Sequence, residues 1–394
     1  MRILFIHEVN YTTKVIFEMH EFPELLALRG HDVSFFHYPE APQKPMRRLR
    51  TVRERIPGRV HPDATITLIT PPTLGGGPAE RYAAPLLNLP SLRREIVHGG
   101  YDLVVLYAVP TTGWQAVSIA RRAGVPVVFR ALDVSHQIRS SAVAPLIKAA
   151  ERHIYRRADL LSANNPAMLE YCVELSGRTG PSAVHLPPIN LDHFAQSVDA
   201  DLHASLGLTA SNRVVLYMGS FFSFSGLDVV VRGMVPQFAA HPELRLVLVG
   251  GGEIDAELRA LVDELGLQEK VIFTGLVPYT SLPQYLKLAD VAINPFRLEL
   301  LTHVALPHKV LQYMAAGVPA VSTSLRGLRG VLGDAAGVTW ADSPDEVAAV
   351  AAALATGDPA DRARRVKLQR ERVAALFTES ATVDALEESL LSLG

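Results

Sequence analysis

The sequence predicts an α/β protein made of two doubly wound domains, each with a parallel sheet. Three observations lead to this prediction. Short apolar segments alternate with amphipathic ones, the alternation starts again after a proline-containing segment at residues 185–194, and 394 residues are enough for two domains. Hydrophobic residues make up 48% of the chain and charged residues 20%, which is typical of a folded chain with a large core.

The first half is predicted to follow the order of βαβ units. Short apolar runs predict strands at residues 2–7, 32–38, 102–108, 125–130 and 160–163. Helical patterns occupy residues 15–29, 113–123, 143–157 and 166–175. The first of these helices should kink or break at Pro23, because proline lacks a backbone donor, and should end at Gly30.

The second half repeats the alternation, with strands expected at residues 213–219, 245–250, 271–274, 291–294, 320–322 and 337–340. The final stretch is helical and places Val383, Leu386, Leu390 and Leu393 on one face. We therefore expect an N-terminal domain at residues 1–190, a second domain at 191–375, and a terminal helix at 376–394 that packs back towards the first domain.

The charge balance argues against one class of binding partner, and the cysteine content indicates the kind of compartment. Lysine and arginine total 38 against 40 acidic residues, a net charge of −2, which argues against a globally basic nucleic-acid binder. The single cysteine, Cys172, excludes an internal disulfide and a cysteine-based zinc site, and suits a reducing compartment. Glu8 follows the first apolar run and no run reaches the length of a membrane span, so we expect a cytoplasmic protein with at most peripheral contact at the inner face of the membrane.

One segment departs from this even balance of charge. From Lys44 to Arg59 the chain carries seven basic residues and a single acid, Glu54. The segment is either a solvated loop after the second strand or a patch that contacts anionic lipid or a phosphorylated acceptor, because clustered basic side chains are attracted to anionic surfaces.

Two common nucleotide-binding motifs are absent. Residues 8–13, which follow the first predicted strand, contain no glycine, so there is no GxGxxG loop, and no GxxxxGK[ST] loop occurs. Glycines instead follow two strands of the second half: Gly219 and Gly226, then Gly250, Gly251 and Gly252. At the carboxyl ends of parallel strands, glycines let backbone amides approach a phosphate, although they are equally compatible with tight turns alone.

A third segment favours the phosphate interpretation. Pro307 can begin a helix, which puts Lys309 in its first turn and Gln312 three residues later on the same side. Because a lysine at a helix start opposes the helix dipole, its presence there suggests an anionic ligand.

Residues 306–321 strongly resemble the donor-site signature of GT-B glycosyltransferases of the family-4 type. Residues 219–234, 246–253 and 271–291 are similar to the family's first strand–loop–helix, its glycine turn and its base-recognition region. In the first half, residues 101–107, 123–134 and 156–168 occupy the family's usual places, and residues 186–194 resemble its interdomain segment.

The resemblance implies a GT-B architecture, in which two Rossmann-like domains face each other across a cleft. It also implies a retaining, metal-independent transfer of a sugar from a nucleoside-diphosphate sugar to a hydroxyl, with the donor as co-substrate and no cofactor. On this interpretation Lys309 meets the diphosphate, helped by backbone amides of Val304, Ala305 and Leu306. Gln312 contacts the ribose, and Leu276 and Val277 offer backbone groups to the base.

The sequence departs from the family pattern at residues that are expected to lie near the donor diphosphate. Ser220 and Ser225 stand where the family often has a basic pair. Arg297 either replaces one of these charges or is an ordinary surface arginine.

Acceptor contacts are expected from the first domain. Asp133, at the end of a strand, either orients or deprotonates an acceptor hydroxyl or caps the following helix. His136 either acts beside it or is a surface histidine. Weaker candidates are Asn10, Tyr11, Lys14 and Arg130. The histidines of this domain lack metal-ligand spacing, so no metal site is expected.

Two rival functions stay open at this point: a non-catalytic nucleotide-sugar-binding protein and a sugar-nucleotide 2-epimerase of the same fold. The acceptor is either a lipid-linked molecule of cell-envelope glycan assembly or a small molecule of secondary metabolism. The residues do not specify the base or the sugar of the donor.

Overall fold

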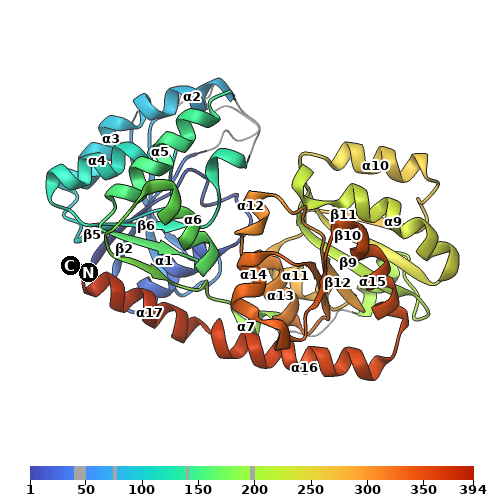
Figure 1. Ribbon diagram of the computed structural model, residues 1–394. Coiled ribbons are helices and arrows are strands. Elements are labelled where there is room, and N and C mark those ends of the chain that lie inside the picture. Colours follow the sequence, from blue (N-terminus) through green and yellow to red (C-terminus); the bar gives the residue numbers. More distant parts are fainter. Residues whose placement is uncertain (40–49, 74–77, 139–141, 196–199) are drawn as a thin grey trace. The chain divides into compact units, whose positions relative to one another are not determined.

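The computed structural model describes residues 1–39, 50–73, 78–138, 142–195 and 200–394. The chain forms two compact units (Figure 1). Unit 1 comprises residues 1–188 and 379–394, and unit 2 comprises residues 189–378. Both units are α/β with a largely parallel sheet, as the sequence predicts.

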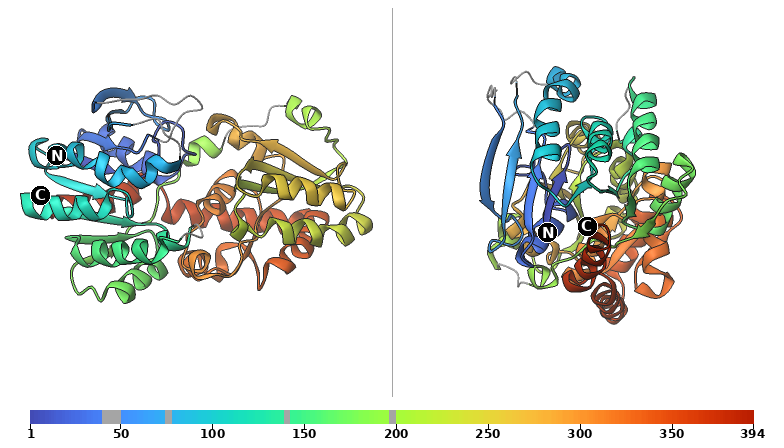
Figure 2. Two further views of the ribbon diagram at one scale, coloured as in Figure 1. Left: turned by 90° about the horizontal axis from the view of Figure 1, so that it is seen from above. Right: turned by 90° about the vertical axis from the view of Figure 1, so that its left-hand side faces the viewer.

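The sheet of unit 1 has the order β3-β4-β2-β1-β5-β6-β7-β8. All neighbouring strands pair in parallel except β3 and β4, which are antiparallel at one edge (Figure 2, right). The chain order reverses between β1 and β5, and ligands of open α/β sheets bind at such a reversal, outside the carboxyl ends of the strands. The strands are β1 (Arg2–Ile6), β2 (Asp32–Phe36), β3 (Val52–Pro57), β4 (Thr65–Thr70), β5 (Leu103–Leu106), β6 (Val127–Ala131), β7 (Leu160–Ala163) and β8 (Ser182–Val184).

Helices cover this sheet, and apolar residues of β1, β2 and β5 form the core beneath α1. In α1, which starts at Glu18, later than the sequence predicts, Pro23 neither ends nor breaks the helix. The helices are α1 (Glu18–Leu28), α2 (Pro78–Leu87), α3 (Leu89–His98), α4 (Gly113–Ala123), α5 (Ala144–Arg157), α6 (Pro166–Ser176) and α17 (Glu379–Leu391).

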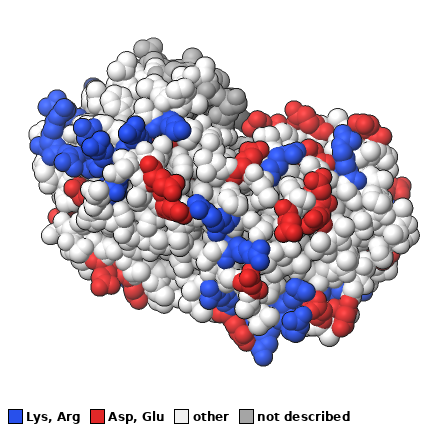
Figure 3. Space-filling view, viewed as in Figure 1, with Lys and Arg blue, Asp and Glu red and all other residues white. Residues whose placement is uncertain are grey.

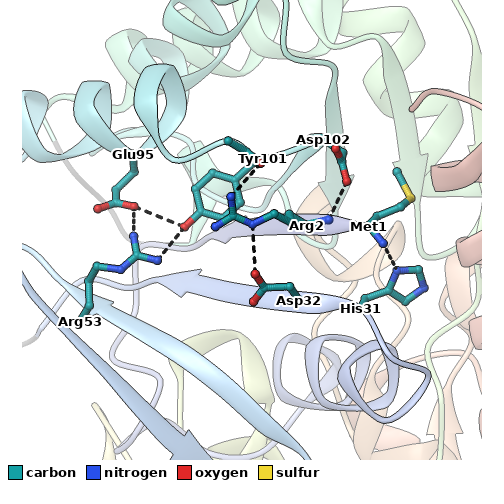
Figure 4. A network of polar contacts seen from close by, with 9 residues as sticks. Met1, Arg2, His31, Asp32, Arg53, Glu95, Tyr101 and Asp102 are labelled. Carbon is teal, nitrogen blue, oxygen red and sulfur yellow. Dashed lines mark hydrogen bonds and ion pairs between the residues drawn. The ribbon is translucent and has the colours of Figure 1, made fainter.

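Part of the basic segment, residues 44–59, forms a strand. Residues 40–49 lie outside the described residues, but residues 52–57 form the edge strand β3, so the loop interpretation is wrong for this half. Arg53 of β3 donates hydrogen bonds to Glu95 and to the Tyr101 hydroxyl (Figure 4). Arg59 donates to the backbone oxygens of Lys14 and Tyr11 at 2.6 and 2.7 Å. These two arginines are therefore engaged within the protein and do not form a free patch.

The terminal helix α17 belongs to unit 1. Val383, Leu386 and Leu390 are fully buried in the core that contains β1 and β2. Glu387 accepts a hydrogen bond from Arg29 at 2.5 Å and lies 2.6 Å from the His31 ring. The two ends of the chain lie close together in this unit (Figures 1 and 2).

Unit 2 has a six-stranded parallel sheet in the order β11-β10-β9-β12-β13-β14. Numbered within the unit, this is the order 3-2-1-4-5-6 of dinucleotide-binding folds, and the reversal lies between β9 and β12. The strands are β9 (Arg213–Ser220), β10 (Leu244–Gly251), β11 (Val271–Gly275), β12 (Val291–Asn294), β13 (Ala320–Thr323) and β14 (Thr339–Ala341).

The helices of unit 2 include α9 and α15, which pack together and share one apolar core with β9 and β10. In order, they are α7 (Leu191–Phe194), α8 (Ala200–Ser205), α9 (Leu227–Ala240), α10 (Asp255–Glu264), α11 (Leu282–Leu286), α12 (Leu300–His303), α13 (His308–Ala316), α14 (Arg326–Leu332), α15 (Pro344–Thr356) and α16 (Pro359–Leu376). No described helix of either unit is long and apolar enough to cross a membrane.

Candidate functional site

The candidate donor site of unit 2 lies where β9 and β12 end. Gly219 closes β9 with a φ of +133°, and a Cβ placed there would be 3.0 Å from the Nζ of Lys309. An L-residue is strained at this φ, and its side chain would occupy the space beside the lysine. The positive φ is therefore the reason for glycine at residue 219, while the flexible end of Lys309 would have to shift to admit a Cβ.

The remaining candidate glycines differ in role. A Cβ at Gly226, Gly250 or Gly252 would lie 2.1, 2.1 or 2.6 Å from a neighbouring backbone atom, so close packing alone requires glycine there. At Gly251 a Cβ would meet no atom within 4 Å. The turn interpretation thus accounts for three of these glycines, while Gly219 and Gly251 border open or lysine-lined space.

Lys309 lies in the first turn of α13 and is only partly exposed. Its Nζ donates to the Tyr217 hydroxyl at 2.5 Å and lies 3.9 Å from the centre of the Tyr217 ring and 4.6 Å from that of Phe296. Burial lowers the pKa of the ammonium well below its usual range. Within the described part of the chain no carboxylate pairs with Lys309, so an anionic ligand would supply the missing counter-charge.

Helix α13 is fixed to the two strands at the reversal. The Tyr313 hydroxyl accepts a hydrogen bond from the Met218 amide at 3.0 Å and donates to the Ile293 carbonyl at 3.2 Å. One side chain thereby ties α13 to both β9 and β12. Gln312, predicted to contact a ribose, is buried on the same helix.

The loop before α13 offers fewer free amides than expected. The amide of Val304 donates to the Leu300 carbonyl at 3.3 Å, and that of Ala305 donates to the Thr302 carbonyl at 3.1 Å. Both are used to close α12, so the predicted role of these two amides at a diphosphate is not supported. Leu306, which precedes Pro307, is the remaining candidate of the three.

Arg297 is not a free cation. Its Nη2 lies 2.8 and 2.6 Å from the two carboxylate oxygens of Asp228, and its Nε donates to the Ser223 carbonyl at 3.1 Å. It therefore ties the loop after β12 to α9, and its proposed replacement of a missing phosphate charge is wrong in this structure. Ser225 is fully buried and donates to the Phe222 carbonyl, whereas Ser220 is partly exposed.

The predicted base-recognition residues follow β11. Gly275 has a φ of +71°, and the next residue, Leu276, is 77% exposed. Val277 is partly buried. The exposed side chain of Leu276 leaves a surface at the end of β11, and the predicted role of the two backbone groups stays a prediction.

In unit 1, Asp133 and His136 follow β6. Asp133 is an exposed residue as a whole, but the protein around its carboxyl raises the pKa of that group to about 6. Desolvation of the carboxyl is the largest cause, the Glu18 carboxylate adds to it, and Lys14 opposes it. The His136 Nδ1 lies 2.6 Å from Oε2 of Glu151, whose side chain is fully buried. Burial also raises the pKa of Glu151, and the contact with His136 opposes this shift.

Two predicted acceptor residues are enclosed in the core. Arg130 is 1% exposed and forms two hydrogen bonds with Glu18, at 2.7 and 2.9 Å, and one with Ser162 at 2.9 Å. Tyr11 is fully buried and donates its hydroxyl to Glu24. Neither side chain is free to touch an acceptor, so both predictions are wrong as stated.

The other two acceptor candidates differ from each other. Asn10 is nearly buried and accepts hydrogen bonds from the amide and the hydroxyl of Thr12 at 2.9 and 2.8 Å, so it shapes its own loop. Lys14 keeps a partly exposed side chain and lies close enough to influence Asp133. Of the four, Lys14 is the best placed.

Sequence reasoning missed the acids that hold these groups in place. Glu18 and Glu24 of α1 and Glu151 of α5 are all buried and pair with predicted site residues. A signal was present, because Glu18, Glu21 and Glu24 recur every three residues on one side of a helix without a basic partner in that helix.

Comparison with known protein families agrees with this geometry. Residues 212–356 match the family described as "Glycosyl transferases group 1", and residues 19–188 match "Glycosyl transferase 4-like domain". The chain belongs to the GT-B glycosyltransferases of the family-4 type. Each match falls within one of the two units, so both halves of this GT-B chain are assigned independently.

Relatives of this GT-B chain include the D-inositol 3-phosphate glycosyltransferases of Mycobacterium tuberculosis and Mycobacterium bovis, 28% identical over 325 residues. That similarity covers 75% of this chain and 63% of the relatives, so the chain spans less than two thirds of their length. Among solved structures, sucrose-phosphate synthase from Thermosynechococcus elongatus has a TM-score of 0.79 at 21% identity, covering 100% of this chain and 98% of that one. HepE of Anabaena in complex with UDP and glucose has a TM-score of 0.76 at 17% identity, covering 100% of both chains. These structures show the same fold.

Proposed function

We propose that this GT-B chain is an enzyme that transfers a sugar from a nucleoside-diphosphate sugar to an acceptor hydroxyl, with retention of the anomeric configuration. The observation that carries the proposal is the partly buried Lys309 ammonium, which opposes Gly219 at the reversal of the unit 2 sheet. Retention follows from the resemblance of residues 306–321 to the family-4 signature.

In the proposed reaction the bond between the sugar C1 and the diphosphate oxygen breaks, and a bond between C1 and the acceptor oxygen forms. Negative charge builds up on the departing diphosphate, and the Lys309 ammonium stabilises it electrostatically. The group is already desolvated and held by Tyr217, so little reorganisation is needed during the reaction. A diphosphate bound there would in turn raise the pKa of the ammonium towards its ordinary value.

We assign the acceptor to unit 1. The exposed Asp133 carboxylate orients the acceptor hydroxyl or takes its proton, and its raised pKa of about 6 suits this work near neutral pH. We propose two further acceptor contacts, His136 and Lys14. The names of the mycobacterial relatives make an inositol phosphate the first acceptor to test, and HepE, which was solved in complex with UDP-glucose, makes a UDP-sugar the first donor.

The proposal also covers the need for a metal ion and the cellular role of the enzyme. Among the described residues, no group of three or more His, Cys, Asp or Glu side chains is arranged to hold a metal ion, and we propose a metal-independent reaction. We also propose a cytoplasmic role in cell-envelope glycan or secondary-metabolite assembly. The non-catalytic and epimerase alternatives are not favoured, because the matching families and relatives are described as glycosyltransferases.

The test is an acceptor-dependent transfer assay with a panel of nucleoside-diphosphate sugars, in the presence and absence of EDTA. We expect release of nucleoside diphosphate only with both substrates, unaffected by EDTA, and NMR of the product should give the same anomer as the donor. Diphosphate release without an acceptor and with an epimerised sugar would instead identify an epimerase. Binding without turnover of any pair would favour the non-catalytic alternative.

A further inference from the structure

Three neighbouring helices of unit 1 expose basic side chains on their outer sides. α3 packs against α4, and α4 packs against α5. The exposed residues include Arg93, Arg94, Arg121, Arg122, Arg152 and Arg156, which we call the basic face. Blue side chains gather over these helices at the upper left of Figure 3. In the described part of the chain, none of the six arginines forms an ion pair with a carboxylate.

The same three helices expose no acid. Their two carboxylates, Glu95 and Glu151, are both buried, and they pair with Arg53 and His136. The helix α6, which packs against α5, carries the exposed acids Glu170 and Glu174. Because the whole chain has a net charge of −2, the positive charge of the basic face reflects a strongly uneven distribution.

Large apolar side chains border the basic face at one end. Leu89, Trp114 and Leu146 lie at or near the starts of α3, α4 and α5 and are 37, 44 and 71% exposed. The starts of α4 and α5 adjoin the carboxyl ends of β5 and β6, which these helices follow. At the opposite ends Arg121 donates to the Arg157 carbonyl at 3.0 Å, which places the last turns of α4 and α5 side by side. The surface therefore has an apolar margin along the carboxyl edge of the sheet and arginines beyond it.

We propose that the basic face docks this protein on an anionic phospholipid bilayer, with Trp114 and Leu146 entering the headgroup region. Arginines gain from the negative surface potential of such a bilayer, and exposed tryptophan and leucine gain from leaving water at the same interface. A nucleic acid could use the arginines, but it offers the exposed leucines no apolar environment. The combination of the two residue classes therefore favours the bilayer.

Docking in this orientation has a consequence for the reaction. Asp133 follows β6 at the same carboxyl edge as the starts of α4 and α5. A docked protein would bring its candidate acceptor residues to the bilayer, so a lipid-linked acceptor would suit it; this last step rests on the proposed function. The docking itself does not rest on any activity, so the two proposals can fail separately.

Co-sedimentation with vesicles tests the proposal on the full chain. The probe is a vesicle of equal parts phosphatidylcholine and phosphatidylglycerol at low salt, compared with phosphatidylcholine alone. One variant combines Arg121→Gln, Arg122→Gln, Arg152→Gln and Arg156→Gln. The matched control removes four exposed basic residues of unit 2, namely Arg232, Arg364, Lys367 and Arg370, again by substitution with glutamine.

We expect binding to anionic vesicles only, weakened at least tenfold in the first variant and less than twofold in the control. In a Trp340→Phe background, where Trp114 is the sole tryptophan, vesicles should shift its emission to shorter wavelength. Circular dichroism checks that the variants are folded. Absence of binding at low salt, equal loss in the control, or binding to a duplex oligonucleotide but not to vesicles would each overturn the proposal.

Discussion

The ammonium of Lys309 lies 2.5 Å from the hydroxyl of Tyr217 and 3.9 Å from the centre of its ring. A neutral hydroxyl and an aromatic face stabilise a cation partially, but neither carries the counter-charge that a desolvated ammonium needs. The pair thus holds Lys309 in position with part of its electrostatic requirement unmet. This is the arrangement expected of a site prepared for an anionic ligand, and it has consequences for stability as well as for binding.

Lys309→Met should stabilise the protein in the absence of ligand while abolishing its response to nucleoside diphosphates. The substitution removes a desolvated charge and keeps an unbranched side chain of similar length. We expect a gain of about 1–2 kcal/mol, or a rise in Tm of about 2–6 °C for a unit of this size. Differential scanning calorimetry with and without UDP checks both parts, and a fall in the ligand-free Tm would contradict the account.

The affinity for UDP should depend on pH above neutrality. The pKa of Lys309 is lowered, so the ammonium is present below that pKa and is lost as the pH rises through it, earlier than for an ordinary lysine. The terminal phosphate is fully ionised above about pH 7, so it does not mask this effect. Titration calorimetry between pH 7 and 8.5, below the range in which the uracil imide of UDP ionises, should show a decline in the wild type. Lys309→Arg, whose side chain stays charged throughout, should remove that decline.

We expect kcat/KM to fall at acidic pH because of Asp133. Its raised pKa of about 6 means that the charged form is lost as the pH falls through that value. We expect kcat/KM to rise between pH 5 and 7 and to level off above, and Asp133→Asn to lower the plateau by about 10²-fold or more. Asp133 caps no helix in the described part of the chain, because Val134 and Val143 stand at the N-cap positions that follow it and neither helix start has a side-chain cap. An unchanged rate for this variant would therefore mean that Asp133 takes no part in the reaction.

Glu151 should act through His136. The buried carboxylate fixes the imidazole with Nδ1 towards Glu151, which leaves Nε2 as the atom that can face an acceptor. Glu151→Gln should lower kcat at least about tenfold with little change in the donor KM, and it should alter the tautomer of His136 seen by ¹⁵N NMR. The control Glu174→Gln, on the exposed side of α6, should change neither quantity. An effect on Tm alone would mean that the contact is only structural.

Arg130 should prove to be a residue of the core. Arg130→Met leaves the buried Glu18 carboxylate without its partner, which typically costs about 3–5 kcal/mol. The double variant with Glu18→Gln should recover part of the loss, because it removes the orphaned charge as well. Thermal unfolding of the two variants measures this. A stable Arg130→Met protein with weakened acceptor binding would instead support the acceptor role predicted from the sequence.

The fold was largely predictable because it rests on apolar periodicity. The strands of unit 2 are close to the predicted ranges, since each is a short buried run between turn residues. In unit 1 the strands β3, β4 and β8 were not predicted. β3 was missed because its alternation of Arg53, Arg55 and Pro57 with Val52 and Ile56 resembles an exposed polar loop. Edge strands exposed to water carry few apolar residues, so the pattern on which such predictions rely is weak there.

The candidate site was predictable only in part. Lys309 could be found from its place beside Pro307 at a helix start, a local signal. The roles of Arg297 and Arg130 depend on Asp228 and Glu18, which are 69 and 112 residues away in the sequence. Whether an arginine is free or paired is decided by such long-range contacts, and one sequence does not reveal them.

The most direct test of the central claim is titration calorimetry of UDP into three proteins at pH 7.5: the wild type, Lys309→Ala and Lys367→Ala. Lys367 is an exposed lysine of the same unit and serves as the matched control. If Lys309 holds the donor diphosphate, the Kd should rise at least tenfold in Lys309→Ala and stay within twofold in Lys367→Ala. Equal affinity of all three proteins for UDP would contradict the account.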